Sequence, residues 1–221
     1  MHLPAFFPLM RKASRIRPAE REALNLYLSK IQIPDDTVVS PDLFKNKNSP
    51  LFLEIGFGKG EFLYKMAVQH PDINFVGIEI FITGVAKLIR KMCNYDNSNP
   101  PQPENIKILI KDARLALKEN FLDNSIQKVF ILFPDPWPKK RHHKRRLINS
   151  EFAELLRRRL VKDGSVLIAT DHEGYLEVIR EVMKEAGFKE EISSEPLVLE
   201  TRYAKKALER GGQIYQFLFR K

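Results

Sequence analysis

The chain has 221 residues, of which 43% are hydrophobic and 29% are charged, so it can bury the core of one large domain. Its single cysteine, Cys93, excludes an intrachain disulfide and a multi-thiolate metal site. No apolar stretch approaches the roughly 18 residues that span a bilayer, and the N-terminal apolar run is too short for a secretory signal. We therefore expect a cytoplasmic protein with no metal site and no membrane segment.

Positive charge is concentrated in one part of the sequence, although the formal net charge of the whole chain is +9. Residues 139–146 contain six Lys or Arg and two His, and Arg157, Arg158 and Arg159 follow shortly afterwards. A surface that is basic by chance would have its lysines scattered evenly. The clustering indicates a polyanionic partner, either a nucleic acid or an anionic membrane surface.

The first 49 residues differ in pattern from the rest of the chain. Residues 1–17 carry prolines and basic side chains without periodicity, which is typical of an arm that becomes ordered on binding. A helix is predicted over Pro18–Ile31, because its apolar residues fall on one face, and a polar loop follows. We therefore divide the chain into a basic N-terminal arm and helix, 1–49, and one folded domain, 50–221.

From residue 51 onward, predicted strands alternate with predicted helices. Runs of β-branched and aromatic residues predict strands over Leu51–Ile55, Asn74–Ile80, Ile106–Ile110, Ile126–Phe133 and Ser165–Ala169. Apolar residues at helical spacing predict helices over Glu61–Gln69, Gly84–Asn94, Asn149–Val161 and Gly174–Ala186, with a short one after Ala113. Asp163-Gly164 is interpreted as the stop of the third of these helices. The alternation predicts a parallel sheet with helices on both faces.

Two apolar segments near the C-terminus break this alternation. They span Pro196–Leu199 and Ile214–Phe219, and no helix is predicted between them. We interpret them as a pair of antiparallel strands at the edge of the sheet.

A glycine-rich turn, Gly56-Phe57-Gly58-Lys59-Gly60, follows the first strand and precedes a helix. Glycine lets the backbone approach a ligand closely, because there is no Cβ to collide with it. Glu79 lies about 20 residues beyond the glycines at the end of the next strand, where an acid can bind a ribose diol. Asp112 follows the third strand and is suitably placed for a contact with the edge of a base. This layout predicts a nucleotide-type cofactor.

Two carboxylates favour one cofactor class over another. A dinucleotide site would have Gly-x-Gly-x-x-Gly, but position 61 is Glu. Glu54, two residues before the first glycine, would be unfavourable beside a pyrophosphate and favourable beside a cation. S-adenosylmethionine carries an ammonium and a sulfonium and no phosphate, so the charges favour it. The alternative interpretation is that Glu54 pairs with Lys59 on the surface.

The stretch from Phe133 to Arg146 joins a carboxylate, the only tryptophan and the basic cluster. Three prolines alternate with Phe133, Asp135 and Trp137, and each restricts the residue before it to extended geometry. The loop follows the predicted strand Ile126–Phe133, so it leaves the carboxyl end of a strand, where open α/β sheets bind their ligands. Trp137 stacks on a target base or packs under the loop, and the sequence leaves both possibilities open.

Several segments together resemble the tRNA (guanine-N7-)-methyltransferases of the bacterial single-subunit type. They are Leu53–Gly60, Gly77-Ile78-Glu79, the loop 134–146, Ala169-Thr170-Asp171 and Thr201-Arg202-Tyr203. The string Asp-Pro-Trp-Pro-Lys-Lys-Arg-His-x-Lys-Arg-Arg is the specific part, whereas a glycine loop alone is not. The resemblance implies a Rossmann-like, seven-stranded methyltransferase sheet, mostly parallel, with an antiparallel C-terminal edge and helices on both faces.

The resemblance also implies a reaction, which is methyl transfer from S-adenosylmethionine to N7 of a guanine in the variable loop of tRNA, at position 46. It implies cofactor contacts from Glu54, Gly56, Gly58, Gly60, Glu79, Asp112 and Asp135. Substrate contacts are implied for Lys139, Asp171, Thr201, Arg202 and Tyr203. RNA contacts are implied for Arg141, His142, His143, Lys144, Arg145 and Arg146. Ala204 departs from the pattern, since the family usually has Glu at that position.

Guanine N7 has a free lone pair and no proton to lose, so its methylation needs no general base. Positioning and electrostatics must supply most of the acceleration. As positive charge moves from sulfur onto the purine, a carboxylate that accepts from the ring N1–H and the exocyclic amine gains strength. Our hypothesis gives this catalytic role to Asp135, with Asp171 as second candidate. The alternative for Asp135 is a turn-capping role.

Two other functions share some of these features. A dinucleotide-dependent oxidoreductase would have the same fold class, but Glu54 and Glu61 disfavour it. A non-catalytic RNA-binding protein would need only the basic cluster, and the acids at successive strand ends would then have no role.

Overall fold

The computed structural model describes residues 16–94, 100–192 and 195–221, and the predicted N-terminal arm lies almost entirely outside these ranges. The helices are α1 (Pro18–Ile31), η1 (Pro41–Leu43), α2 (Glu61–Gln69), α3 (Ile82–Met92), α4 (Ala113–Glu119), η2 (Lys140–Arg145), α5 (Ser150–Arg159), α6 (Glu173–Glu185), α7 (Pro196–Leu199) and α8 (Arg202–Glu209). The strands are β1 (Leu51–Ile55), β2 (Asn74–Ile78), β3 (Ile106–Leu109), β4 (Ile126–Leu132), β5 (Leu160–Thr170), β6 (Lys189–Glu191) and β7 (Tyr215–Arg220).

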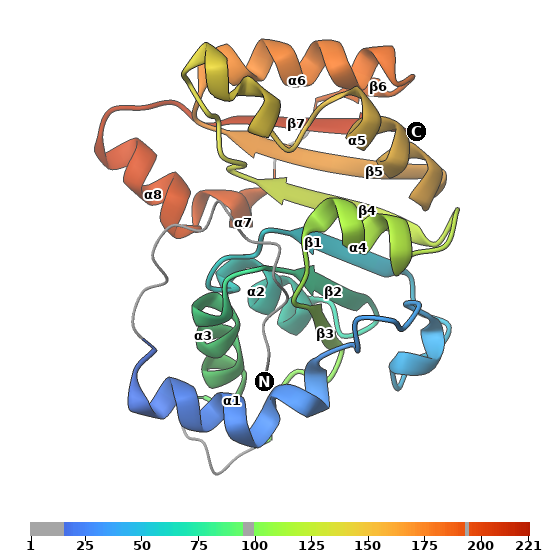
Figure 1. The fold of residues 1–221 in the computed structure, drawn as a ribbon, viewed down its shortest axis with the longest axis vertical. Helices are drawn as coiled ribbons and strands as arrows, with labels where there is room; N and C mark the ends of the chain where they lie inside the picture. Colours follow the sequence, from blue (N-terminus) through green and yellow to red (C-terminus); the bar gives the residue numbers. More distant parts are fainter. Residues whose placement is uncertain (1–15, 95–99, 193–194) are drawn as a thin grey trace.

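Within the described ranges, seven strands form one sheet in the order β3-β2-β1-β4-β5-β7-β6 (Figure 1). Strands β1 to β5 pair in parallel, and β7 runs antiparallel to both β5 and β6. The predicted Rossmann-like sheet with an antiparallel C-terminal edge is therefore confirmed. The strand order reverses direction between β1 and β4, and open sheets of this type bind ligands beyond the carboxyl ends of the strands at such a point.

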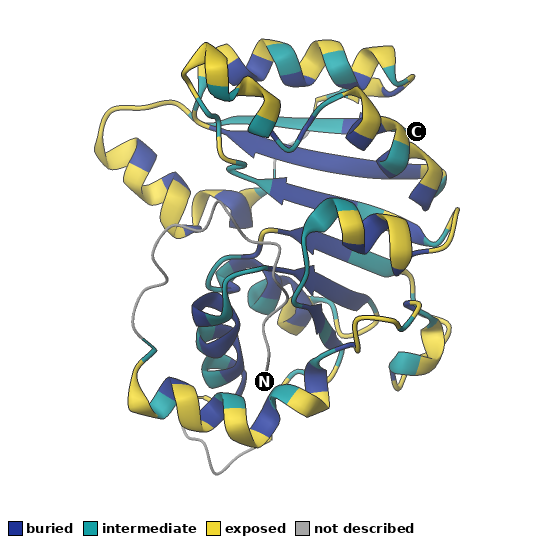
Figure 2. Ribbon diagram, viewed as in Figure 1, coloured by how far each residue is buried: buried dark blue, intermediate teal, exposed yellow. Residues whose placement is uncertain are grey.

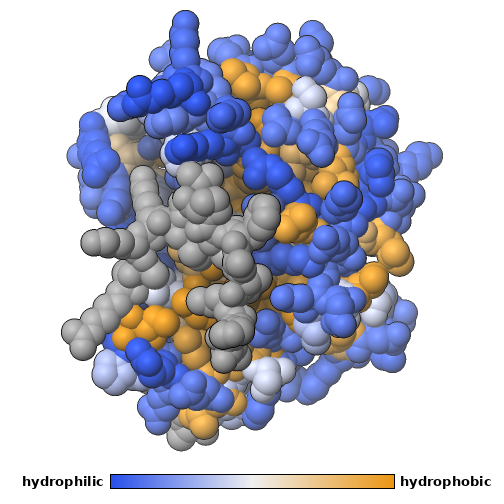
Figure 3. Space-filling model, in the orientation of Figure 1, coloured by the Kyte–Doolittle hydropathy of each residue, from blue (hydrophilic) through white to orange (hydrophobic). Residues whose placement is uncertain are grey.

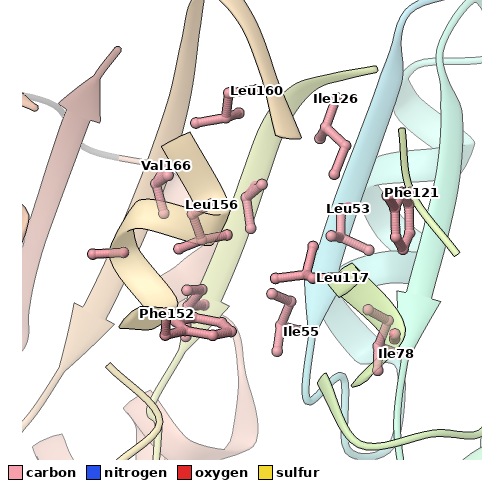
Figure 4. Packing of buried hydrophobic residues seen from close by; sticks show 14 of the residues in the cluster. Leu53, Ile55, Ile78, Leu117, Phe121, Ile126, Phe152, Leu156, Leu160 and Val166 are labelled. Carbon is pink, nitrogen blue, oxygen red and sulfur yellow. The ribbon is translucent and has the colours of Figure 1, made fainter. Parts of the chain in front are cut away.

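Two hydrophobic clusters hold helices against the two faces of the sheet. On one face, Leu53 and Val166 of the sheet pack with Leu117 of α4 and Phe152 of α5 (Figure 4). The other face is covered by α1, α2, α3 and α7. Strands β1 to β5 are buried along most of their length, whereas the helices expose their outer sides (Figure 2). Each fully buried aliphatic side chain contributes about 1.5–3 kcal/mol to folding.

Helix α1 belongs to the same core as the sheet, although it precedes the predicted domain. Its residues Ala23, Tyr27 and Ile31 share a cluster with Leu88 and Ile89 of α3. The described part of the N-terminal segment therefore packs on the core of the sheet. The division of the chain at residue 49 stays a prediction. Among the described residues, no helix combines the length and the apolar composition that a bilayer span requires.

Strand β5 begins five residues earlier than predicted. Helix α5 ends at Arg159, and Leu160 already has extended geometry. The pairing with β4 jumps from Ile126–Leu160 to Lys128–Ser165, so Asp163 and its neighbours bulge out of the strand. Asp163 has φ +60°, a left-handed conformation that Asp tolerates better than most residues. The turn signal at Asp163-Gly164 therefore marks a bulge and not the end of a helix.

The prediction of a strand over Pro196–Leu199 is wrong, because this segment is helix α7. Pro196 occupies the first turn, where its missing N–H costs nothing, and the Glu195 side chain accepts from the backbone N–H of Leu197. On the outer side of β7, at the edge of the sheet, the antiparallel partner is instead β6, Lys189–Glu191. Its three charged residues carry no apolar alternation, so no sequence pattern indicated a strand there.

Candidate active site

Five predicted acids gather at one edge of the sheet. Because β1 to β5 are parallel, their carboxyl ends lie together, on the left of Figure 1. The acids follow the order of the strands, from Asp112 after β3, through Glu79 after β2 and Glu54 at the end of β1, to Asp135 after β4 and Asp171 after β5. We call these five acids the rim. The rim is centred on the point between β1 and β4 where the strand order reverses.

The glycine turn leaves open space beside its backbone. Gly56 and Gly58 have φ values of +73° and +57°, and a Cβ added to either would meet no atom within 4 Å. On the opposite side, a Cβ on Gly84 would lie 2.0 Å from the Gly58 carbonyl oxygen, so α3 packs directly against the turn. The turn is therefore supported from one side and accessible from the other, as a cofactor cradle requires.

Glu54 is a buried carboxylate with an unused acceptor. It is only 4% exposed, and its Oε2 atom has no hydrogen-bond partner among the described residues. Burial and the neighbouring negative charge of Glu79 raise the pKa of Glu54 to about 8. The alternative of a surface pair with Lys59 is excluded, because Glu54 does not reach the surface. A cation bound beside it would supply the missing partner.

The raised pKa of Glu54 predicts how stability depends on pH in the absence of a cofactor. The folded state retains the Glu54 proton between the ordinary pKa of 4.5 and about 8, whereas the unfolded state releases it. The free energy of unfolding should therefore fall over this range as pH rises, by at most about 1.4 kcal/mol per pH unit. In Glu54→Gln this contribution is absent. Urea unfolding at several pH values should show a shallower decline for the variant, and equal declines would contradict the assignment.

Glu79 is fixed by three backbone donors. Its Oε2 accepts from the N–H of Gly58 at 2.7 Å, and its Oε1 accepts from the N–H groups of Ile80 and Phe81 at 2.8 and 2.9 Å. Burial raises the pKa of Glu79, the backbone donors oppose this, and the charge of Asp135 adds to it. The turn at Glu79 explains why β2 ends at Ile78, two residues before the predicted end. The carboxylate links the glycine turn to the end of β2.

Asp112 has a structural contact as well as a place on the rim. Its Oδ1 atom accepts from the N–H groups of Arg114 and Leu115, so it caps helix α4. The side chain is 41% exposed, which leaves part of the carboxylate accessible at the end of β3. The cap therefore fixes its position without burying it.

The loop after β4 has a strained backbone on both sides of Asp135. Phe133 and Trp137 have φ values of +54° and +41°, so the prediction that the prolines hold both residues in extended geometry is wrong. Residues other than glycine rarely adopt such φ values. Phe133 N–H also donates to the Ala169 carbonyl at 2.8 Å, which ties the loop to the end of β5. Asp135 is exposed on this restricted loop. Such strain clusters at functional sites, where the surrounding structure holds it.

Arg146 is buried and supports the loop from within. Its Nε donates to the Pro136 carbonyl at 2.8 Å, and its guanidinium lies 4.6 Å from the centre of the Tyr175 ring. Its own carbonyl accepts from Arg114 on α4 at 2.8 Å. The prediction that Arg146 contacts RNA is therefore corrected to a supporting role. Sequence alone did not separate this buried arginine from the exposed cations beside it.

Replacing Arg146 with Ala should lower the free energy of unfolding by about 2 kcal/mol, because the Pro136 carbonyl loses its buried donor. Arg141→Ala is the matched control, since Arg141 is exposed in the same segment, and should change stability by less than about 0.5 kcal/mol. Urea unfolding of both variants gives the comparison. Equal, small effects would remove the supporting role of Arg146.

The rest of the basic segment forms the short helix η2 at the surface. Arg141, His143 and Lys144 are exposed. Trp137 is half-buried, with the Arg145 guanidinium 5.0 Å from its ring centre and the His142 ring edge-on at 5.7 Å. The tryptophan thus packs against η2, as in the second of the two arrangements left open by the sequence. Lys139 precedes η2 and is also exposed.

Helix α8 brings the predicted Thr201-Arg202-Tyr203 segment to the same edge. Thr201 is buried and caps the helix by accepting from the Ala204 N–H at 3.3 Å. Arg202 N–H donates to Glu61 Oε2 of α2 at 3.2 Å. The exposed Tyr203 ring stacks on Phe133, with centroids 6.1 Å apart. Sequence analysis could not place α8, because these contacts join residues 70 to 141 positions apart.

Ala204, which departs from the family pattern, lies in the first turn of α8. The Ala204 side chain is fully buried on the inner side of α8, so this position offers no polar group to the site.

The arrangement fits S-adenosylmethionine better than a dinucleotide. The open glycine turn, the orphaned Glu54 oxygen and the neighbouring Glu79 form a cradle lined by carboxyl groups. A sulfonium or ammonium would favour the ionised form of Glu54, whereas a pyrophosphate would oppose it. Glu54, Glu79 and Asp112 are the residues that would hold this group. No cluster of three His, Cys, Asp or Glu side chains within the described ranges could hold a metal ion.

This fold and this rim of carboxylates define an S-adenosylmethionine-dependent methyltransferase. Residues 48–217 match the protein-family model described as “Putative methyltransferase”. Among solved structures, the chain is similar to an antibiotic-related methyltransferase, with TM-score 0.57, 19% identity and coverage of 85% of this chain and 96% of that one. The 16S rRNA methyltransferase KamB aligns with TM-score 0.55, 15% identity and coverage of 94% of both chains. These two likenesses support the fold alone.

The chain belongs to the tRNA (guanine-N7-)-methyltransferase family. The relative of this name from Wolbachia pipientis wMel is 36% identical over 201 residues, covering 89% of this chain and 84% of the relative. The one from Legionella pneumophila subsp. pneumophila is 33% identical over 221 residues, covering 94% of each. The relative from Buchnera aphidicola is 36% identical over 184 residues, covering 80% of this chain and 74% of the relative.

Proposed function

We propose that this protein methylates N7 of a guanine in the variable loop of tRNA, at position 46, with S-adenosylmethionine as donor. One observation carries the proposal: the unpartnered, buried carboxylate of Glu54 lies on a rim that continues through Asp135 into the exposed cations of η2. A site for a cationic donor thus adjoins a surface for RNA phosphates. The relatives named tRNA (guanine-N7-)-methyltransferase support the same substrate.

The carboxylates near β1 and β2 position the donor. When bound, S-adenosylmethionine supplies a methyl group on a positively charged sulfur. Glu54 ionises when a cation binds its unpartnered oxygen. Glu79 lies next to the glycine turn, where a ribose diol would donate hydrogen bonds to its carboxylate. Asp112, at the end of β3, offers an exposed oxygen to the edge of the base.

Asp135 is the proposed catalytic residue, because it is exposed on a rigid loop beside this donor site. It accepts hydrogen bonds from N1–H and the exocyclic amine of guanine. S-adenosylmethionine would supply the methyl group to N7, and its sulfur would keep the electron pair of the carbon–sulfur bond. Positive charge then rests on the purine, and the bonds to Asp135 strengthen. No proton has to leave N7.

Exposed residues around the rim bind the RNA. Arg141, His143 and Lys144 of η2 contact phosphates, while Lys139 and Asp171 contact the target nucleotide at the ends of β4 and β5. Arg202 and Tyr203 approach it from α8, and the stacking of Tyr203 on Phe133 connects α8 to the catalytic loop.

The proposal is tested by incubating the protein with unfractionated tRNA and S-adenosylmethionine labelled in its methyl group. The label should enter the RNA, and chemical scission selective for 7-methylguanosine should release it at a chain break. Label that enters the RNA but resists this scission would refute N7 as the target. Absence of any label would refute the methyltransferase activity on tRNA.

A further inference from the structure

Four cations from three elements, the glycine turn, α3 and α8, meet beside the glycine turn, away from η2. Lys59 lies in the turn itself. The backbone contact from Arg202 to Glu61 places the start of α8 against the start of α2, next to Lys59. Lys206 follows Arg202 by four residues on α8 and therefore lies on the same side of that helix. Both α8 cations are exposed.

The fourth cation comes from α3. Gly84 packs against the Gly58 carbonyl, and Lys87 lies three residues further along the same face of α3. The electrostatics agree with this geometry. Burial lowers the pKa of Lys59, and the positive charges of Arg202, Lys87 and Lys206 lower it further, while Glu61 opposes them.

The positive charge of this cluster is only partly balanced by the acids that face it. The negative charge of Glu61 interacts with Lys59, and that of Glu20 on α1 interacts with Lys87. Glu20 is already paired with Arg17 at 2.7 Å. Figure 3 shows strongly hydrophilic side chains over α8 on this side of the molecule. The cluster therefore has positive charge available for an anion.

We propose that Lys59, Lys87, Arg202 and Lys206 bind phosphates of the tRNA backbone on the side of the catalytic pocket opposite η2. The loop that carries η2 is held by Arg146, which contacts α4 and α6 on one face of the sheet. The new cluster comes from α3 and the turn before α2, which pack on the other face, and from α8, which contacts α2. This inference rests on the proposed function, and it means that the RNA crosses the rim of acids with phosphate contacts at both sides.

The number and position of the cations favour RNA over the cofactor. S-adenosylmethionine offers one carboxylate, whereas four cations match successive phosphates. Lys206 is also exposed one turn along α8 from the contact with α2, where it can reach a backbone that passes over the surface.

The double variant Lys87→Ala with Lys206→Ala tests the inference in the full chain. Its affinity for tRNA should fall about tenfold. The plot of log affinity against log salt concentration has a negative slope, which should become shallower by about 2. Lys162→Ala with Lys184→Ala is the matched control, because these exposed lysines lie on β5 and α6, near the opposite edge of the sheet. The control pair removes the same charge and should leave the slope within about 0.5 of wild type. Circular dichroism and thermal unfolding verify the fold of both proteins.

Calorimetry with S-adenosylhomocysteine on the same proteins separates the two ligands. The inference requires unchanged affinity for this compound in the double variant. A loss of its binding without loss of tRNA binding would assign the cluster to the cofactor and overturn the inference, as would a tRNA salt slope equal to that of the control pair. If wild type methylates tRNA while the variants behave alike, the inference fails and the proposed function stands. If wild type does not bind tRNA, both fail.

Discussion

Asp135→Asn should reduce the rate of methyl transfer to tRNA by about a hundredfold or more, while the protein stays folded and binds its cofactor. The expected size is that of removing one preorganised group that stabilises transition-state charge. Asparagine keeps the shape of the side chain, but it cannot offer the full negative charge that strengthens as the purine becomes cationic. Single-turnover assays at saturating S-adenosylmethionine measure this step.

The control for this variant is Asp163→Asn. Asp163 is exposed in the β5 bulge at φ +60°, a conformation that Asn also tolerates, so the same chemical change there should leave the rate within about twofold of wild type. Calorimetry with S-adenosylhomocysteine confirms cofactor binding by both proteins. A wild-type rate for Asp135→Asn would remove the catalytic role, and Asp171→Asn would then be the next variant to examine.

Arg141→Ala combined with Lys144→Ala should weaken tRNA binding about tenfold or more and reduce its salt slope by about 2. Both side chains are exposed in η2 and their removal leaves the buried Arg146 in place, so the fold should be unaffected. Filter binding over a series of salt concentrations gives affinity and slope together. The Lys162 and Lys184 pair again provides the charge-matched control, and an unchanged slope for the η2 variant would show that these side chains do not contact phosphate.

Local sequence patterns predicted the elements in which the spacing of apolar side chains shows which face is buried. Alternating apolar strands and amphipathic helices gave the parallel sheet, and parallel strands necessarily bring Glu54, Glu79 and Asp112 to one edge. The position of Glu54 in the sequence also indicates a cationic ligand, and its burial and unpartnered oxygen agree with that prediction. The features that escaped depend on contacts between distant residues. The three charged residues of β6 form a strand only because β7 offers them an edge, and α7 is helical because Pro196 starts a capped turn.

The basic cluster illustrates the same limit within the site. Its sequence indicates a nucleic-acid partner, but it does not separate the exposed Lys144 from the buried Arg146. That difference depends on Tyr175 and Arg114, which lie about 30 residues away on each side. The cations at Lys87 and Lys206 likewise have no common motif, and they meet only because α3 and α8 pack around the glycine turn.

The proposed methylation is tested most directly with two transcripts of one tRNA that differ only in having guanine or adenine at position 46 of the variable loop. A donor site beside an RNA surface that selects this nucleotide predicts close to one methyl group per guanine transcript and none on the adenine transcript. Equal methylation of both transcripts would contradict methylation of the guanine at position 46.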